Sequence, residues 1–246
     1  MSHQPRAYRN YMQKQGLVSF SVAVKETDLH IQADRDLENY ARERVLLHRD
    51  VLEKYTVRYP EFAATLTPWT RDDPMPAIVE DMVLASRRTG VGPMAAVAGA
   101  IASWVGADLL DRSEEVIVEN GGDVFLKTFS PVTIGIHAGE SSPASGMLMR
   151  AGGGDAPVGV CTSSGTIGHS TSFGKSDAVC VLSGSCTLAD AAATAIGNRV
   201  RTGDDIRTAI EWGRKIEEVQ GLVVVAGGKV GAWGDVELVP AGRKKG

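Results

Sequence analysis

The chain has 246 residues, a formal net charge of −4, and 43% hydrophobic residues. This length and apolar content are enough for a substantial core, in one large domain or in two closely packed ones. The mild negative charge argues against a nucleic-acid partner, which needs a basic surface. No stretch approaches the length of a membrane span, so we expect a soluble, cytoplasmic protein without a membrane partner.

The three cysteines, Cys161, Cys180 and Cys186, form no CxxC pair. An odd number of cysteines in a chain of this size argues against a disulfide framework and favours a reducing compartment. Cys161 and Cys180 lie in apolar runs and are predicted to be inert core residues.

The N-terminal third predicts scaffold elements. Residues 17–25 and 28–33 alternate apolar and polar side chains around Glu26–Thr27, which is typical of a β-hairpin. Helical spacing from Asp36 to Tyr59 stops at Pro60, and a second helix is expected to open at Pro76. Residues 90–106 then predict a small-residue helix that is apolar on all sides and therefore buried, running on to Asp111.

The C-terminal half predicts strands alternating with helices. The expected elements are strands at 115–119, 124–127, 132–137 and 178–182, a loop over 139–157, a helix from Asp190 to about Val200, a helix over 204–218, and a final hairpin around Gly227–Gly228. Both halves repeat one plan of helix, strand, Gly-Gly turn and strand. The order of elements favours an α+β fold with mostly antiparallel sheet.

The most informative segment runs from Cys161 to Thr194. A loop rich in serine, threonine and glycine, Thr162 to Ser172, is followed by a short apolar strand and a helix that is expected to open with Asp190. Asp190 and Thr194 are four residues apart, so they share one helix face, and the alanines between them allow another surface to approach closely. This pattern is typical of a metal or phosphate site.

Four short patches together resemble the ApbE-like flavin transferases, the FAD:protein FMN transferases. Asn120-Gly-Gly-Asp123 with Ile134-Gly-Ile136 is similar to their N-x-GGD…GI segment, and Cys161-Thr-Ser-Ser-Gly165 to their ATSG loop. Ala189-Asp-Ala-Ala-Ala-Thr194 is similar to their ADALAT helix start, and Gly99-Ala-Ile-Ala102 to the start of G-x-I-A-K-G. The ordered set covers about residues 85–200 and is most similar to the shorter UPF0280 or DUF375 branch.

The resemblance implies a single ApbE-like (T-fold-like) domain over 1–246, with an N-terminal hairpin and helices in 1–75 and a ligand-binding core in 76–240. It implies Mg²⁺ at Asp190, Thr194 and a backbone carbonyl of the small-residue segment, with FAD or FMN as the nucleotide ligand. We expect a ligand cleft between residues 90–106, the Asn120 turn, the Thr162–Ser172 loop and the Asp190 helix start. Asp190 and His169 are the candidate catalytic residues, because a histidine flanked by small polar residues can act as a general base or phosphate ligand near neutral pH. The implied nucleotide-binding residues are Asn120, Gly121, Gly122, Asp123, Thr162, Ser163, Ser164, Gly165 and Thr166. Backbone amides in such loops bind phosphate.

Two departures weaken the implied transfer reaction. Ser103 stands where the family has lysine, and the bulky Trp104 where it has glycine. The H-I-x-D-P-x-T-G segment of the transferases is also absent after the Ser/Gly loop. We therefore do not expect full transfer of FMN to a protein threonine.

Each candidate residue also has a purely structural interpretation. Asp190 would lie in the first turn of its helix and interact favourably with the helix dipole, with Thr187 as the N-cap. The Thr194 hydroxyl would donate back to the Asp190 carbonyl. His169 would be a hydrogen-bonded loop residue, and Asn120–Asp123 simply a tight turn.

Two functional readings compete. The first is an enzyme or enzyme relative that binds a flavin nucleotide with Mg²⁺; the second is a non-catalytic ligand sensor or carrier that has lost the metal chemistry. A passive structural oligomer is less favoured, although the apolar helices allow a homodimer.

Overall fold

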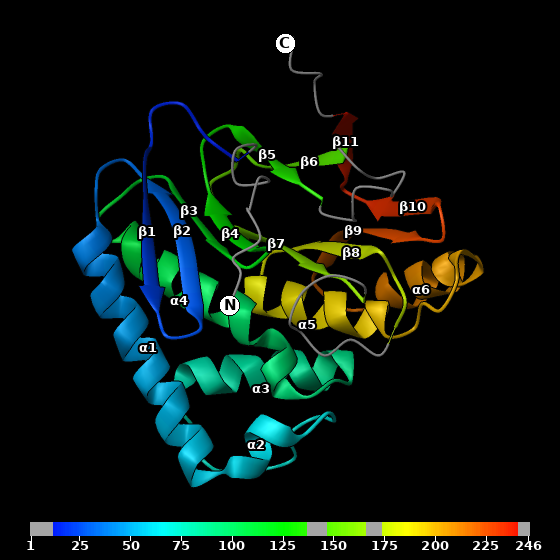
Figure 1. Ribbon diagram of the computed structural model, residues 1–246, viewed down its shortest axis with the longest axis horizontal. Helices are drawn as coiled ribbons and strands as arrows, with labels where there is room; N and C mark the ends of the chain where they lie inside the picture. Colours follow the sequence, from blue (N-terminus) through cyan, green and yellow to red (C-terminus); the bar gives the residue numbers. More distant parts are fainter. Residues whose placement is uncertain (1–11, 137–146, 166–173, 241–246) are drawn as a thin grey trace.

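The computed structural model describes residues 12–136, 147–165 and 174–240. Its centre is an eight-stranded sheet of order β1-β2-β3-β4-β7-β8-β9-β10, in which all neighbouring strands are antiparallel. Helices cover one face, and a three-stranded antiparallel sheet of order β11-β6-β5 lies on the other (Figure 1). The predicted α+β, mostly antiparallel fold is confirmed.

The strands of the large sheet are β1 (Val18–Val24), β2 (Thr27–Ala33), β3 (Val116–Asn120), β4 (Asp123–Lys127), β7 (Val158–Ser163), β8 (Ala178–Ser183), β9 (Val219–Ala226) and β10 (Lys229–Gly234). Those of the small sheet are β5 (Pro131–Gly135), β6 (Met147–Gly152) and β11 (Glu237–Pro240). The helices are α1 (Glu38–Arg58), α2 (Pro60–Ala64), α3 (Ala77–Thr89), η2 (Pro93–Ala96), α4 (Val97–Leu110), α5 (Cys186–Gly197), η3 (Gly203–Asp205) and α6 (Ile206–Gly213).

The central strands are buried on both faces. In β4, Phe125 belongs to the core under the helices, whereas Val124 and Leu126 belong to the core under the small sheet. Because side chains alternate along a strand, a strand between two layers must be apolar at every position. This explains the unbroken apolar runs of β8 and β9 in the sequence.

The predicted internal similarity of the two halves is seen in the structure. α4 leads into the β3–β4 hairpin, and α6 leads into the β9–β10 hairpin. Both hairpins turn on a glycine pair, Gly121–Gly122 and Gly227–Gly228, and all four glycines have positive φ. Two-residue hairpin turns favour such glycines because their backbone twist matches that of the strands.

Several predicted boundaries were wrong. The first hairpin turns at Lys25–Glu26, so Thr27 already belongs to β2. Helix α5 begins at Cys186 rather than at Asp190, because the Ser185 side chain caps it by accepting the amide of Leu188 at 3.1 Å. It ends at Gly197, short of the expected Val200.

Two further segments differ from the expectation. The predicted helix over 204–218 is a 3₁₀ turn followed by α6, which ends at Gly213. Part of the expected loop over 139–157 forms β6, because the buried Leu148 and Met149 complete the small sheet between β5 and β11.

The expectation that no stretch reaches membrane-span length was also wrong. Residues Pro93–Leu110 form an 18-residue helical stretch with a mean hydropathy of 1.4, the one such stretch among the described residues. Half of it is buried inside the protein, where α4 packs against α1, α5, β3 and β4. Its apolar character on all sides is therefore that of a core helix, as the sequence predicted.

Candidate functional site

The centre of the site is a contact between α5 and the start of α4. The Asp190 carboxylate, on the second turn of α5, accepts a hydrogen bond from the Gly99 amide through Oδ2 at 2.8 Å. The N-cap residue of α4 is Ala96, and its side chain makes no capping hydrogen bond. Asp190 thus satisfies first-turn amides of α4 from a different helix, where the helix dipole favours a negative charge.

Gly99 is required for this contact. A Cβ added there would lie 2.5 Å from the Cys186 carbonyl oxygen and 2.7 Å from the Asp190 Cβ. The small residues of α4 and α5 therefore allow the two helices to approach closely enough for a carboxylate to reach a backbone amide.

The β3–β4 hairpin contacts the same turn of α4. Asn120 donates from Nδ2 to the Ala98 carbonyl at 3.0 Å, and the Gly122 amide donates to Glu119 Oε1 at 3.1 Å. The Asn-Gly-Gly-Asp segment is therefore a tight turn, as its structural interpretation required, and it is also joined to the start of α4.

Asp123 lies beside Asp190 at this centre, and we call the two residues the carboxylate pair. Asp123 opens β4 opposite Cys161 of β7, and it is only 7% exposed. Burial is the main reason why the pKa of Asp123 lies well above its ordinary value, and the negative charges of Asp190 and Glu119 raise it further. Hydrogen bonds from the Cys161 thiol and the Thr162 amide act in the opposite direction. Burial likewise raises the pKa of Asp190 to about 7, although hydrogen bonds from the Gly99 and Ala98 amides lower it.

The Ser/Thr loop begins later than the sequence predicted. Thr162 and Ser163 are the last residues of β7, and Ser163 is buried. Thr162 pairs with Cys180 of β8, whose side chain belongs to the core under the small sheet. The Thr162 side chain therefore points away from the carboxylate pair, although its backbone lies next to Gly122.

Beyond β7, the Gly165 amide donates to the Ser176 carbonyl at 3.0 Å, closing the ends of the loop, and Ser164 precedes it. Two candidate residues, Thr166 and His169, lie outside the described residues.

The three cysteines are free and buried, as expected for core residues. Cys161 and Cys186 place their Sγ atoms 3.5 Å apart, directly between the strand that faces Asp123 and the first turn of α5. Burial raises the pKa of the Cys161 thiol well above its ordinary value, so it stays protonated.

The structural interpretations of Thr187 and Thr194 were wrong. Thr187 is not the N-cap of α5; its hydroxyl donates to Asp81 Oδ2 of α3 at 2.5 Å. The Thr194 hydroxyl does not bond back to the Asp190 carbonyl, and it makes no hydrogen bond to any other residue in the part of the chain that the structure describes. It lies one turn beyond Asp190 and is partly exposed.

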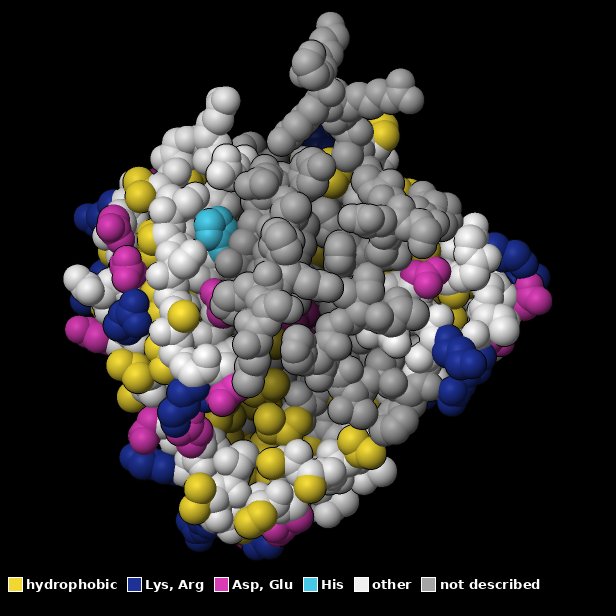
Figure 2. All heavy atoms as spheres, in the orientation of Figure 1, with side chains coloured by type: hydrophobic (Ala, Val, Ile, Leu, Met, Phe, Trp, Pro, Cys, Tyr) yellow, Lys and Arg dark blue, Asp and Glu magenta, His cyan; other side chains and the backbone are white. Residues whose placement is uncertain are grey.

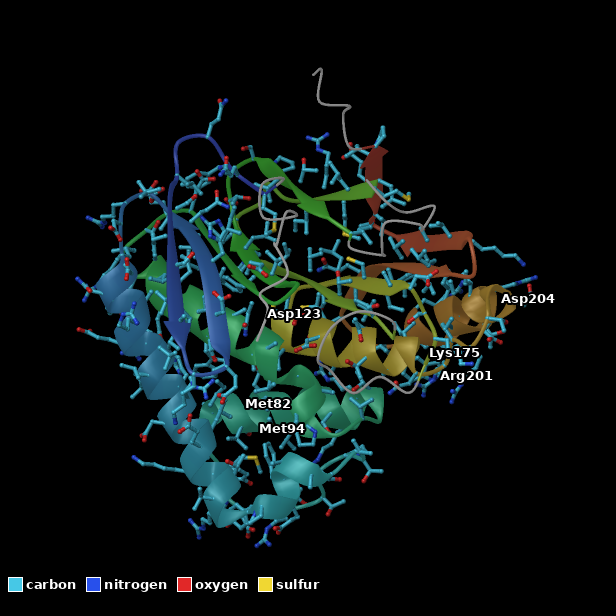
Figure 3. The ribbon with its side chains drawn as sticks, viewed as in Figure 1. Met82, Met94, Asp123, Lys175, Arg201 and Asp204 are labelled. Carbon is cyan, nitrogen blue, oxygen red and sulfur yellow. The ribbon has the colours of Figure 1, made fainter. Side chains whose placement is uncertain are left out.

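The carboxylate pair lies between an apolar border and a charged end of the molecule. Figure 3 places Asp123 near the first turns of α5, and Lys175 and Arg201 near the other end of that helix. Figure 2 shows apolar side chains gathered on the side of α3 and η2, where Figure 3 labels Met82 and Met94. Met94 is partly exposed there, whereas Met82 is buried.

Within the described residues, no three His, Cys, Asp or Glu side chains are grouped so as to hold a metal ion. A cation at this centre would therefore rest on two carboxylates and on other oxygens. That composition suits Mg²⁺, which usually takes one or two carboxylates and keeps waters or substrate phosphates.

Comparison with known proteins agrees with this geometry. The family described as AbpE bacteria matches residues 9–231. The chain belongs to this family. A UPF0280 protein of Methanosarcina barkeri is 39% identical to this AbpE-family chain over 220 residues, covering 88% of this chain and 86% of the relative. A UPF0280 protein of Methanopyrus kandleri is 39% identical over 227 residues, covering 89% and 91%.

Solved structures share the fold of this AbpE-family chain. The apo flavinyl transferase ApbE of Pseudomonas stutzeri superposes with a TM-score of 0.57 at 12% identity, covering 89% of this chain and 94% of that one. The ApbE protein of Thermotoga maritima gives 0.54 at 14% identity, covering 87% and 96%. The resemblance recognised in the sequence is therefore confirmed at the level of family and fold.

Sequence reasoning missed the contacts that join these segments. The family resemblance led us to expect one cleft between residues 90–106, the Asn120 turn and the Asp190 helix start. It did not indicate that Asp190 accepts the Gly99 amide or that Asp123 lies beside Asp190. The alanines and glycines on α4 and α5 predicted close backbone approach without naming these contacts.

Proposed function

We propose that this protein binds a flavin nucleotide, FAD or FMN, or a similar pyrophosphate ligand, together with Mg²⁺ at Asp190 and Thr194. The observation that carries the proposal is the position of Asp190 and Thr194. The Asp190 carboxylate, which accepts the Gly99 amide of α4, lies one turn of α5 before the Thr194 hydroxyl. That hydroxyl bonds to no residue in the part of the chain that the structure describes. Family membership and the shared fold with flavin transferases support the flavin class.

The residues present fit a magnesium ion. Asp190 accepts the Gly99 amide through Oδ2, and the lone pairs that remain on its two carboxylate oxygens can bind a cation. Thr194 supplies a hydroxyl one turn further along α5. When bound, Mg²⁺ would neutralise pyrophosphate charge and polarise its phosphorus–oxygen bonds. Asp190, held by α4, would orient the ion, and the Asn120 turn would fix the backbone beside it.

The surroundings suit a ligand with one polar and one apolar part. Nucleotide sites combine apolar walls with a few placed polar groups. Here η2, which includes Met94, and α3 pack against α5, the helix of Asp190, and apolar side chains gather on their side of the molecule (Figure 2). A flavin ring against the apolar border and a pyrophosphate at the carboxylate pair would match this division.

Full FMN transfer to a protein threonine is not part of the proposal. Trp104 follows Ser103 on α4, and its indole donates to Asp81 at 3.3 Å and meets the His48 ring edge-on. Its side chain is thus held within the helical layer, and Ser103 offers no cation in place of the family's lysine. Slow hydrolysis of the FAD pyrophosphate remains as the reaction that the centre would support.

The test is the absorbance spectrum of the purified protein after gel filtration with FAD, in Mg²⁺ or in EDTA. We expect a flavin band retained in Mg²⁺ and lost in EDTA, and lost in the Asp190→Asn variant in both. Asp81→Asn is the matched control, because Asp81 also contacts α5 but lies outside the pair. If flavin is retained in EDTA and by the Asp190→Asn variant, the result would favour a non-catalytic binding module. If the wild type retains no flavin, the proposal is refuted.

A further inference from the structure

One oxygen of Asp123 has no partner in the described part of the protein. Its Oδ1 is buried and makes no hydrogen bond there, although the residue is only 7% exposed. Buried polar atoms are almost always paired, because an unpaired one, above all a charged one, destabilises the folded state. Something other than the neighbouring side chains must therefore satisfy this oxygen.

Among the described residues, the charges that act on Asp123 are negative. Asp190 and Glu119 both raise its pKa by their charge, and no lysine or arginine is among the groups that chiefly set the pKa of either member of the pair. Two neighbouring buried carboxylates whose charges interact favour either a shared proton or a bound metal ion.

The backbone fixes Asp123 in this position. It is held between its hairpin partner Asn120, which bonds to Ala98, and its cross-strand partner Cys161, which touches Cys186 in the first turn of α5. Cys186 lies one helical turn before Asp190 on the same face. The two carboxylates are thus joined through two short chains of contacts and cannot separate without disrupting the sheet.

We propose that Asp123 is a metal ligand that acts jointly with Asp190, so that a divalent cation binds the protein before any nucleotide arrives. This inference rests on the proposed function but assigns Asp123 a different role, because the sequence placed it at the border of the nucleotide. A second carboxylate doubles the negative charge that the protein offers the ion, and waters can complete the octahedral shell until phosphate oxygens replace them.

The experiment measures Mn²⁺ binding to the nucleotide-free protein by electron paramagnetic resonance, with Mn²⁺ replacing Mg²⁺. We expect the wild type to bind one ion, and Asp123→Asn and Asp190→Asn each to weaken binding by more than the roughly tenfold to hundredfold loss that removing an outer-shell partner causes. Asparagine keeps the size of the side chain, and it also imitates the protonated acid. Asp81→Asn should bind Mn²⁺ like the wild type, and circular dichroism verifies that each variant is folded.

The outcomes separate this inference from the proposed function. Equal Mn²⁺ affinity in wild type and Asp123→Asn, or no binding by the wild type without nucleotide, overturns the role of Asp123, even if FAD is retained in Mg²⁺. Loss of Mn²⁺ binding in both pair variants, in a wild type that retains no FAD, upholds the metal role and refutes the flavin proposal. A Mn²⁺-induced rise in melting temperature that disappears in Asp123→Asn supports the inference independently.

Discussion

The Asp190 carboxylate accepts the Gly99 amide at 2.8 Å, so one residue of α5 caps the first turn of α4. The same side chain is the one that the family resemblance assigns to the metal. A structural and a functional role therefore coincide in one carboxylate, and variants of Asp190 must be chosen to separate them.

The first prediction separates these roles by comparing two substitutions of Asp190. Asparagine keeps an oxygen that can accept the Gly99 amide, whereas alanine removes it and leaves that amide buried without a partner. We expect Asp190→Ala to be less stable than Asp190→Asn by about 1–3 kcal/mol in urea unfolding. Equal stability of the two variants would show that the hydrogen bond contributes nothing to the fold.

The second prediction concerns the close approach of α4 and α5. Gly99→Ala places a methyl group against the Cys186 carbonyl and Asp190, both within 3 Å of the new atom. We expect a loss of about 1–3 kcal/mol in the free energy of unfolding. The control is Gly154→Ala, where nothing lies within 4 Å and the change should be within about 0.5 kcal/mol.

The third prediction contrasts two threonines of α5. Thr194→Val removes a hydroxyl that bonds to no described residue, so stability should barely change while Mg²⁺-dependent flavin binding weakens. Thr187→Val removes the donor to Asp81 and should cost about 1–3 kcal/mol in stability. Its flavin affinity in the folded fraction should be unchanged. Thermal unfolding and FAD titration check both, and the reverse pattern would place the metal near Thr187.

The fourth prediction concerns pH in the metal-free protein. The folded pKa of Asp190 is about 7, above its ordinary value of 3.8, so the folded state binds the proton more tightly. The contribution of this group to the free energy of unfolding is fully present below about pH 4 and is lost as the pH rises to about 7. In EDTA, the stability of the wild type relative to Asp190→Asn should therefore fall across this range. A difference that is constant with pH would mean that the pair is not desolvated as the structure indicates.

Local patterns were sufficient for most of the elements. The hairpin around residue 26, the helix stopped by Pro60, and the buried helix after Pro93 follow from alternation, proline and composition, and each lies within a few residues of its predicted place. Boundaries failed where a longer-range partner decided them. β6 forms because two neighbouring strands complete its hydrogen bonds, and α5 starts early because Ser185 caps it.

The sequence by itself determined the fold class, the family resemblance and the candidate residues Asp190, Thr194 and the Asn120 turn, because these depend on residue types within short windows. Only the tertiary structure brought Asp190 to Gly99, Asn120 to Ala98 and Asp123 to the same centre. These contacts join residues between 22 and 91 positions apart. Such pairings are set by how the helices pack on the sheet, and no local pattern encodes that packing.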